Sequence, residues 1–163
     1  MKKISLLMTL CMVIICLFGC GNNAVLKSSE AKDAVVDAIE GVKAFDVDKM
    51  CKYFDMDEKD FENLTGKYLE FMNNTFGKLQ YTIDDVEKID EETMVVKATI
   101  NSVDMTDVVD KAMGTVMSSL ASFQGKSQEE VADFLVGCML NSSNREDVKR
   151  IIKAIEITVN KNG

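Results

Sequence analysis

Cysteine has the greatest capacity for covalent chemistry in this sequence. The chain has five cysteines and no histidine. The absence of histidine excludes Ser-His and Cys-His nucleophilic catalysis and most zinc chemistry. Cys20 has the most distinctive surroundings, because it follows the small Gly19 at the end of an apolar run and precedes the polar residues 21–23. A thiol in this position suggests a covalent modification whose nature depends on the residues before it.

The first 19 residues have the parts of an export signal. Lys2 and Lys3 give a positive start, and the 15 residues from Ile4 to Phe18 are almost all apolar. A membrane-spanning helix needs about 20 such residues, so this run is too short to span a bilayer. A charged start, a short apolar centre and a small residue before the break are typical of a secretory signal. An ordinary signal peptide cut elsewhere and an N-terminal membrane anchor remain alternatives.

Residues 17–20, Leu-Phe-Gly-Cys, resemble the lipobox of bacterial lipoproteins. In that motif an aliphatic residue stands three places before a cysteine, and a small residue stands just before it. The resemblance implies a diacylglycerol on the Cys20 sulfur, acyl chains such as palmitate, and cleavage between Gly19 and Cys20. Two acyl chains, at about 0.8 kcal/mol per buried CH₂, hold a protein stably on a bilayer. The resemblance therefore implies a Gram-positive-type lipoprotein on the extracytoplasmic face of the cell membrane.

The signal divides the chain into three segments. We expect a signal peptide at residues 1–19, a lipidated polar tether at 20–29 and one domain at 30–163, a size that suits a single core. Without the signal, 17 basic residues face 27 acidic ones, a net charge of −10. This charge argues against nucleic acid as a partner, and it predicts that an anionic membrane repels the body of the protein.

Two cysteines remain after Cys20 within the expected domain, and two interpretations of them stay open. An even number outside the cell is consistent with a disulfide between Cys51 and Cys138. Each of them also falls on an apolar helical face, where a thiol behaves as a small hydrophobic side chain.

The hydrophobic periodicity predicts helices first, then strands, then helices and a last strand. Apolar residues from Ala31 to Phe45 recur at spacings of three and four, which indicates one long helix capped by Ser29. Alternation predicts a strand from Leu79 to Ile83 and another from Thr93 to Val103, joined as an antiparallel hairpin. The remaining expected elements are a helix at 48–54, a helix opened by the acidic residues 55–60 and ended by Gly77, a helix from 104 to about 120, a helix from a Ser127–Glu130 capping box to about 140, and a strand at 148–160.

This order of elements is typical of the α+β class, with N-terminal helices on a small antiparallel sheet and an inserted helical pair. Residues 34–54 and 79–104 resemble small uncharacterised lipoproteins of Gram-positive bacteria. The resemblance implies a cystatin-like or nuclear transport factor 2-like cone, a curved antiparallel sheet wrapped on a long helix. Such cones usually have four or more strands, whereas three are evident here. The chain ends in Asn-Gly, which favours a hairpin turn, so a truncated chain or a missing terminal strand is one expectation.

The sequence offers candidate binding residues but no catalytic set, no metal site and no cofactor motif. The acidic residues 55–66 fail as a calcium loop, because Asp60 and Gly66 stand where such a loop needs glycine and glutamate. Asp84 and Asp85, close in sequence to Tyr81, could supply a carboxylate base, but a surface strand end is the better explanation of them. An apolar ligand cavity could be lined by aromatic and methionine side chains, although core packing is the favoured interpretation of them: Tyr53, Tyr68, Phe71, Met72 and Tyr81.

The expected function is therefore non-catalytic. We expect a membrane-anchored binding module for an envelope protein, a peptide or a small apolar ligand, held by the diacylglycerol on Cys20. A small carboxylate-based isomerase or hydrolase and a structural or immunity-type surface protein are the alternatives. An apolar pocket with a buried carboxylate near Tyr81 would favour the enzyme, and an exposed apolar patch would favour a protein partner.

Overall fold

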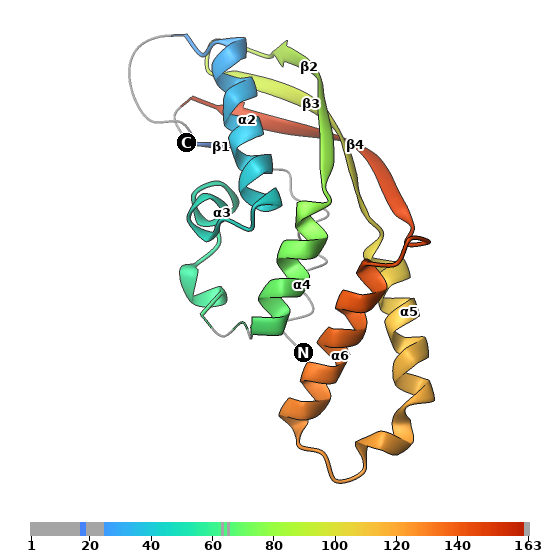
Figure 1. The fold of residues 1–163 in the computed structure, drawn as a ribbon. Coiled ribbons are helices and arrows are strands. Elements are labelled where there is room, and N and C mark those ends of the chain that lie inside the picture. The colour runs from blue at the N-terminus through green and yellow to red at the C-terminus, as the bar shows by residue number, and fades with distance from the viewer. Residues whose placement is uncertain (1–16, 19–24, 63, 65, 162–163) are drawn as a thin grey trace.

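The protein has an α+β fold in which helices cover one face of an antiparallel sheet (Figure 1). The structure, a computed structural model, describes residues 17–18, 25–62, 64 and 66–161. The sheet contains β2 (Gln80–Lys88), β3 (Thr93–Val103) and β4 (Arg150–Asn160), with β3 in the middle. A two-residue strand, β1 (Leu17–Phe18), pairs in parallel with the end of β4. The predicted α+β class and the predicted β2–β3 hairpin are confirmed.

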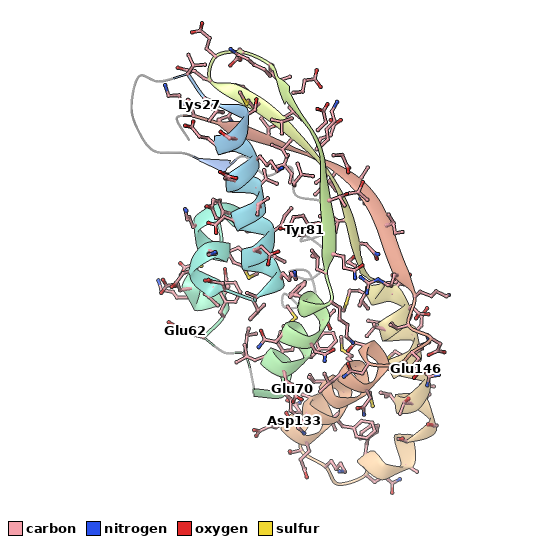
Figure 2. The ribbon with its side chains drawn as sticks, turned by 45° about the horizontal axis from the view of Figure 1, so that its top comes forward. Lys27, Glu62, Glu70, Tyr81, Asp133 and Glu146 are labelled. Atoms are coloured by element: carbon pink, nitrogen blue, oxygen red, sulfur yellow. The ribbon has the colours of Figure 1, made fainter. Side chains whose placement is uncertain are left out.

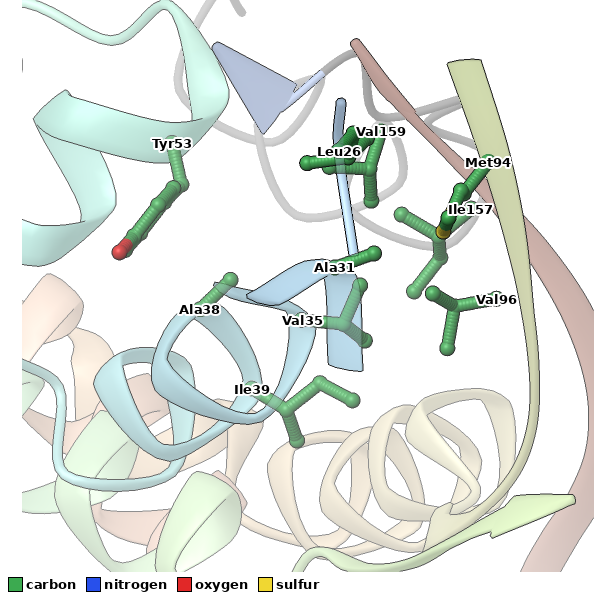
Figure 3. Close-up of a cluster of buried hydrophobic side chains, with 10 residues drawn as sticks. All are labelled: Leu26, Ala31, Val35, Ala38, Ile39, Tyr53, Met94, Val96, Ile157 and Val159. Carbon is green, nitrogen blue, oxygen red and sulfur yellow. The ribbon is translucent and has the colours of Figure 1, made fainter. Parts of the chain in front are cut away.

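Three helices pack with the sheet to form what we call the body of the protein. They are α2 (Ser28–Lys43), α3 (Val47–Phe54) and α4 (Gly66–Gly77). The first core cluster lies between α2 and the sheet, where Val35 of α2 faces Val96 of β3 and Ile157 of β4 (Figure 3). All three of these side chains are almost completely buried. The helical stripe and the strand alternation read from the sequence therefore meet in one core.

A second core cluster continues the body below the end of α2. Phe71 of α4 is fully buried there, with Met50 of α3 and Val103 at the end of β3. Phe45, which follows α2 with a φ of 51°, stacks on Phe76 at a ring-centroid distance of 6.0 Å. The two clusters together make the body a continuous apolar interior.

The remaining helices form an arm that leaves the sheet between β3 and β4 (Figure 1). It consists of α5 (Met105–Ser118), the short 3₁₀ helix η2 (Leu120–Phe123) and α6 (Gln128–Ser143). Its own core cluster contains three buried residues, Ala112, Val116 and Cys138. The capping box predicted for α6 is present, since Ser127 Oγ accepts from the Glu130 N–H and the Glu130 carboxylate accepts from the Ser127 N–H. The predicted inserted helical pair is confirmed.

Several predicted boundaries are wrong, each for a local reason. The long helix begins at Ser28 and not after a Ser29 cap, because the Glu30 carboxylate accepts a hydrogen bond from the Lys27 N–H. The next helix is capped by Asp46, whose carboxylate accepts from the Lys49 N–H, and not by Asp48.

The acidic segment does not open a long helix. Residues Glu58–Asp60 form a single 3₁₀ turn, η1, after Asp55 adopts a φ of 49°, and α4 starts only at Gly66. β2 in turn runs on to Lys88, past the expected end at Ile83, because a bulge between Ile83 and Asp85 shifts its register and lets pairing with β3 continue.

Candidate functional site

The predicted lipidation site lies outside the described part of the chain. Gly19 and Cys20 are not among the described residues, so lipidation and cleavage stay predictions. The two residues just before them form β1, in which Leu17 pairs with Val159 and Phe18 with Asn160. The chain re-enters the described structure at Val25, and Leu26 is already part of the first core cluster.

Cys51 and Cys138 are free thiols, so the disulfide considered from the sequence is not formed. Cys51 is half-buried on α3, which packs against α2, whereas Cys138 is buried on α6, which packs against α4 and α5. Burial raises the pKa of both thiols, and the carboxylates of Glu58 and Asp57 raise that of Cys51 further. Both side chains therefore stay protonated near neutral pH, as inert thiols do.

The five proposed ligand-lining residues are distributed over two core clusters. Tyr53 belongs to the first cluster and Tyr81 packs against it. Phe71 and Met72 belong to the second cluster, and Tyr68 packs against that one. The contacts described here are those of core residues, and the prediction that the five line a shared cavity remains untested.

The two tyrosines of the first cluster direct their hydroxyl groups to carboxylates on α2. Tyr53 Oη donates to Asp37 Oδ2 at 2.7 Å and accepts from Lys52 Nζ at 2.7 Å. Lys49 also donates to Asp37, and this bond, with that from Tyr53, lowers the pKa of Asp37. The network joins α2 to α3 at the edge of the body.

Tyr81 makes the corresponding contact one turn further along α2. Its hydroxyl donates to Glu40 Oε1 at 3.0 Å, and burial together with this bond raises the pKa of Tyr81. Figure 2 shows Tyr81 between α2 and the sheet. Asp84 lies on the opposite face of β2, exposed, where it accepts from Thr82 and Thr99. The carboxylate–tyrosine pair considered from the sequence is therefore not assembled from Asp84 and Tyr81.

A buried carboxylate that the sequence did not single out fixes the arm to the body. Asp107 on α5 is 8% exposed, whereas a carboxylate in the first turn of a helix is usually solvated. Its Oδ2 accepts from Lys111 Nζ at 2.7 Å and from the Lys149 N–H at 2.9 Å. These bonds lower the pKa of Asp107. The four-residue spacing of Asp107 and Lys111 was the one local signal for this pair.

The segment that returns from the arm to β4 completes this junction. Lys111 Nζ also donates to the Asp147 carbonyl at 2.7 Å, and the Asp104 N–H donates to the Lys149 carbonyl at 2.9 Å. Arg145 forms an ion pair with Asp147 and holds the pKa of that carboxyl at about 2. Both ends of the arm are therefore tied to each other where they meet the sheet.

The arm carries an exposed apolar stripe along α5. Val109, Met113 and Met117 are 40%, 46% and 62% exposed. Their spacing of four residues places them on one face of the helix, beside the face that buries Val108, Ala112 and Val116. We call these three exposed residues the α5 stripe. By spacing alone, the apolar residues Val109, Met113, Val116 and Met117 fit one broad face of the helix predicted from 104 to about 120. In the structure only Val116 of these four is buried.

A further surface feature is an open depression beside α3. It is lined by Cys51 and Met56 and by three carboxylates, those of Asp55, Asp57 and Glu58. Within the described residues, no group of three histidine, cysteine, aspartate or glutamate side chains is arranged to hold a metal ion. The helices described here also include none that combines the length and apolar character needed to cross a membrane.

Comparison with known proteins gives one distant structural similarity. No family model matches the chain, and no curated protein matches it. A similar solved structure is that of a proposed lipoprotein (ycdA) from Bacillus subtilis, with a TM-score of 0.47 and 16% sequence identity. The similarity covers 99% of this chain and 48% of the other, so this chain spans about half the length of that protein. The α+β class rests on the elements described above and not on this similarity.

Proposed function

We propose that this protein is a lipid-anchored lipoprotein of the cell envelope whose domain binds another protein without catalysing a reaction. The observation that carries the binding proposal is the α5 stripe, in which Val109, Met113 and Met117 are exposed on one helical face. The anchor is carried by the sequence Leu-Phe-Gly-Cys at 17–20 behind a charged and apolar signal.

The position of the α5 stripe favours a protein partner over a small ligand. The stripe runs along the outside of a helix, so a ligand there would leave much of its own surface in water, whereas pockets for small molecules enclose most of theirs. A partner helix or sheet can cover three side chains spaced over two turns at once. Methionine adapts its shape to the surface it meets, which suits a binding face.

The anchor is tested by replacing the predicted lipidated residue. In cells given a fatty-acid analogue, we expect the wild-type protein to be labelled and Cys20→Ser to be unlabelled and released from membranes. Cys51→Ser is the matched control, because it removes another thiol and should keep the label. Unchanged labelling of Cys20→Ser would refute the anchor.

The binding surface is tested by photocrosslinking in living cells. A photoreactive amino acid replaces Met113 in one variant and Glu156, an exposed residue on the outer face of β4, in another. We expect a discrete crosslinked product at position 113 that is absent at position 156. Equal crosslinking at both positions, or none at 113 in a folded variant, contradicts the assignment of the α5 stripe.

A further inference from the structure

The lipid anchor and the core are separated by a short segment, and this limits how the domain can sit on a membrane. Leu26 is 9% exposed and lies in the first core cluster, and its N–H donates to the Glu91 carbonyl at 3.3 Å. Six residue steps separate it from Cys20. At no more than about 3.6 Å per step, they span roughly 22 Å at most. The part of the domain around Leu26 therefore stays close to any membrane that holds Cys20.

That part of the domain is formed by three segments, which we call the hairpin end: residues 25–27, residues 88–93 from the end of β2 to the start of β3, and residues 160–161. Backbone hydrogen bonds hold the segments together, because Leu26 bonds to Glu91 as described and the Lys161 N–H donates to the Glu92 carbonyl at 2.8 Å. Thr93 also pairs with Asn160 in the sheet. The hairpin end is therefore one continuous surface.

We propose that the hairpin end is the membrane-facing surface of the protein, with Val25 and Ile89 in the headgroup region of the bilayer. This inference rests on the proposed lipid anchor at Cys20 and adds the orientation of the domain to it. Val25 is 49% exposed and Ile89 is 56% exposed, although both are large apolar side chains. The tether is short enough to let a bilayer reach both of them, and contact with the bilayer would remove this apolar surface from water.

The charge of the hairpin end fits this orientation. It carries three lysines, Lys27, Lys88 and Lys161, against three carboxylates, Asp90, Glu91 and Glu92. Including Glu30 in the next turn leaves an excess of one negative charge, whereas the chain without its signal has a net charge of −10. An anionic bilayer repels an acidic surface, so placing the nearly neutral end against it keeps most of the acidic excess away. The repulsion between the acidic domain and an anionic bilayer therefore favours this one orientation of the domain. It does not hold the domain far from the membrane.

The same orientation directs the arm away from the membrane. Figure 1 shows the start of α2 and the β2–β3 hairpin at one end of the molecule and the connection between α5 and α6 at the other. In Figure 2, Lys27 lies at the first end, and Asp133 of α6 lies toward the second. The α5 stripe is then presented to the space beyond the bilayer, where a partner protein can reach it.

The absence of tryptophan from the chain permits a direct test. The full chain is produced in a bacterium that lipidates it, and it carries either Ile89→Trp or Met117→Trp. Each variant is reconstituted into vesicles of phosphatidylcholine and phosphatidylglycerol with bromine atoms near the headgroup end of the acyl chains. We expect the tryptophan fluorescence of Ile89→Trp to shift to the blue and to be quenched by the bromine atoms. The tryptophan fluorescence of Met117→Trp, the matched control on the arm, should stay unchanged. Val25→Trp, expected to behave as Ile89→Trp does, replaces it if circular dichroism shows that Ile89→Trp does not fold.

Flotation of the vesicles separates failure of the anchor from failure of the orientation. Protein that floats but shows no quenching at position 89 or 25 overturns the proposed orientation while the anchor stands. Quenching at position 117 without quenching at 89 overturns it as well, because the arm would then face the bilayer. Protein that does not float refutes the anchor, and the orientation is refuted with it.

Discussion

The body and the arm of this protein bury their apolar side chains to very different extents. The first cluster of the body contains ten buried residues, and the second contains seven, one of which is Val108 of α5, whereas the cluster confined to the arm contains three. The body has a sheet to pack against, and α2 fills one face of it. The arm has only two helices and a 3₁₀ turn, with α4 against one side of α6. A pair of helices cannot enclose the apolar faces of both members, so part of one face stays exposed.

The two regions are therefore stabilised in different ways. Hydrophobic burial, at roughly 25 cal/mol per Å² of apolar surface, dominates in the body. In the arm, the buried Asp107 and its bonds to Lys111 and Lys149 replace part of that contribution where the arm meets the sheet. The apolar surface that remains exposed on α5 is then available for a partner. The body therefore accounts for most of the hydrophobic stability, and the arm is the better candidate for function.

The largest expected effect comes from the core of the body. Phe71→Ala removes a fully buried ring from the second cluster and should lower the free energy of unfolding by about 3–5 kcal/mol. Urea unfolding followed by circular dichroism measures this loss as a lower midpoint at an unchanged slope. A loss under 1 kcal/mol would mean that the second cluster contributes little, and the contrast with the arm would be wrong.

A smaller effect is expected from the core of the arm. Val116→Ala removes two methyl groups from a side chain that is 8% exposed, which should cost about 1.5–3 kcal/mol. Val109→Ala makes the same change on the same helix at a side chain that is 40% exposed, and it should cost much less. Urea unfolding of the two variants compares them directly. Equal losses would show that Val109 is covered and that the α5 stripe is not an exposed surface.

Local patterns allowed much of the fold to be predicted from the sequence. The apolar spacing of α2, the alternation of β3 and the Ser127–Glu130 capping box are each contained within a few neighbouring residues, and all three are present. These features need no information about distant segments. The inserted helical pair also followed from the order of local patterns.

Features that depend on distant segments could not be predicted in this way. Asp107 is buried because the Lys149 backbone, 42 residues later, returns to it. Val109, Met113 and Val116 all fit one helical stripe, and only the position of α6 determines which of them it covers. The separation of Cys51 from Cys138 likewise depends on how α3 and α6 pack. The sequence therefore predicted the elements better than the surfaces between them.

The next effect depends on pH and tests the junction between body and arm. The pKa of Asp107 is lowered in the folded protein, so its ionised form stabilises the fold. This contribution is complete above about pH 4, the ordinary pKa of aspartate, and is lost as the pH falls through the lower pKa of the folded state. Asp107→Asn should be less stable than wild type at pH 7, and the difference in the free energy of unfolding should shrink below pH 4.

Asp110→Asn is the control for this prediction. It removes the same charge at an exposed position of α5 and should leave the dependence of stability on pH unchanged. Parallel profiles for wild type and Asp107→Asn would contradict the role of the junction.

The smallest expected effect on stability distinguishes a binding surface from a structural one. Met117 is 62% exposed, so Met117→Ser should change the free energy of unfolding by less than about 0.5 kcal/mol. Met139→Ser is the matched control, because this α6 methionine packs against the core clusters of both regions and its loss should lower stability clearly. In cells, Met117→Ser should nevertheless weaken the crosslink formed from position 113, because Val109 is then the only apolar side chain of the α5 stripe that remains beside the photoreactive residue. A variant that unfolds like Met139→Ser would show that Met117 belongs to the core of the arm, and an undiminished crosslink in a folded variant would place the partner elsewhere.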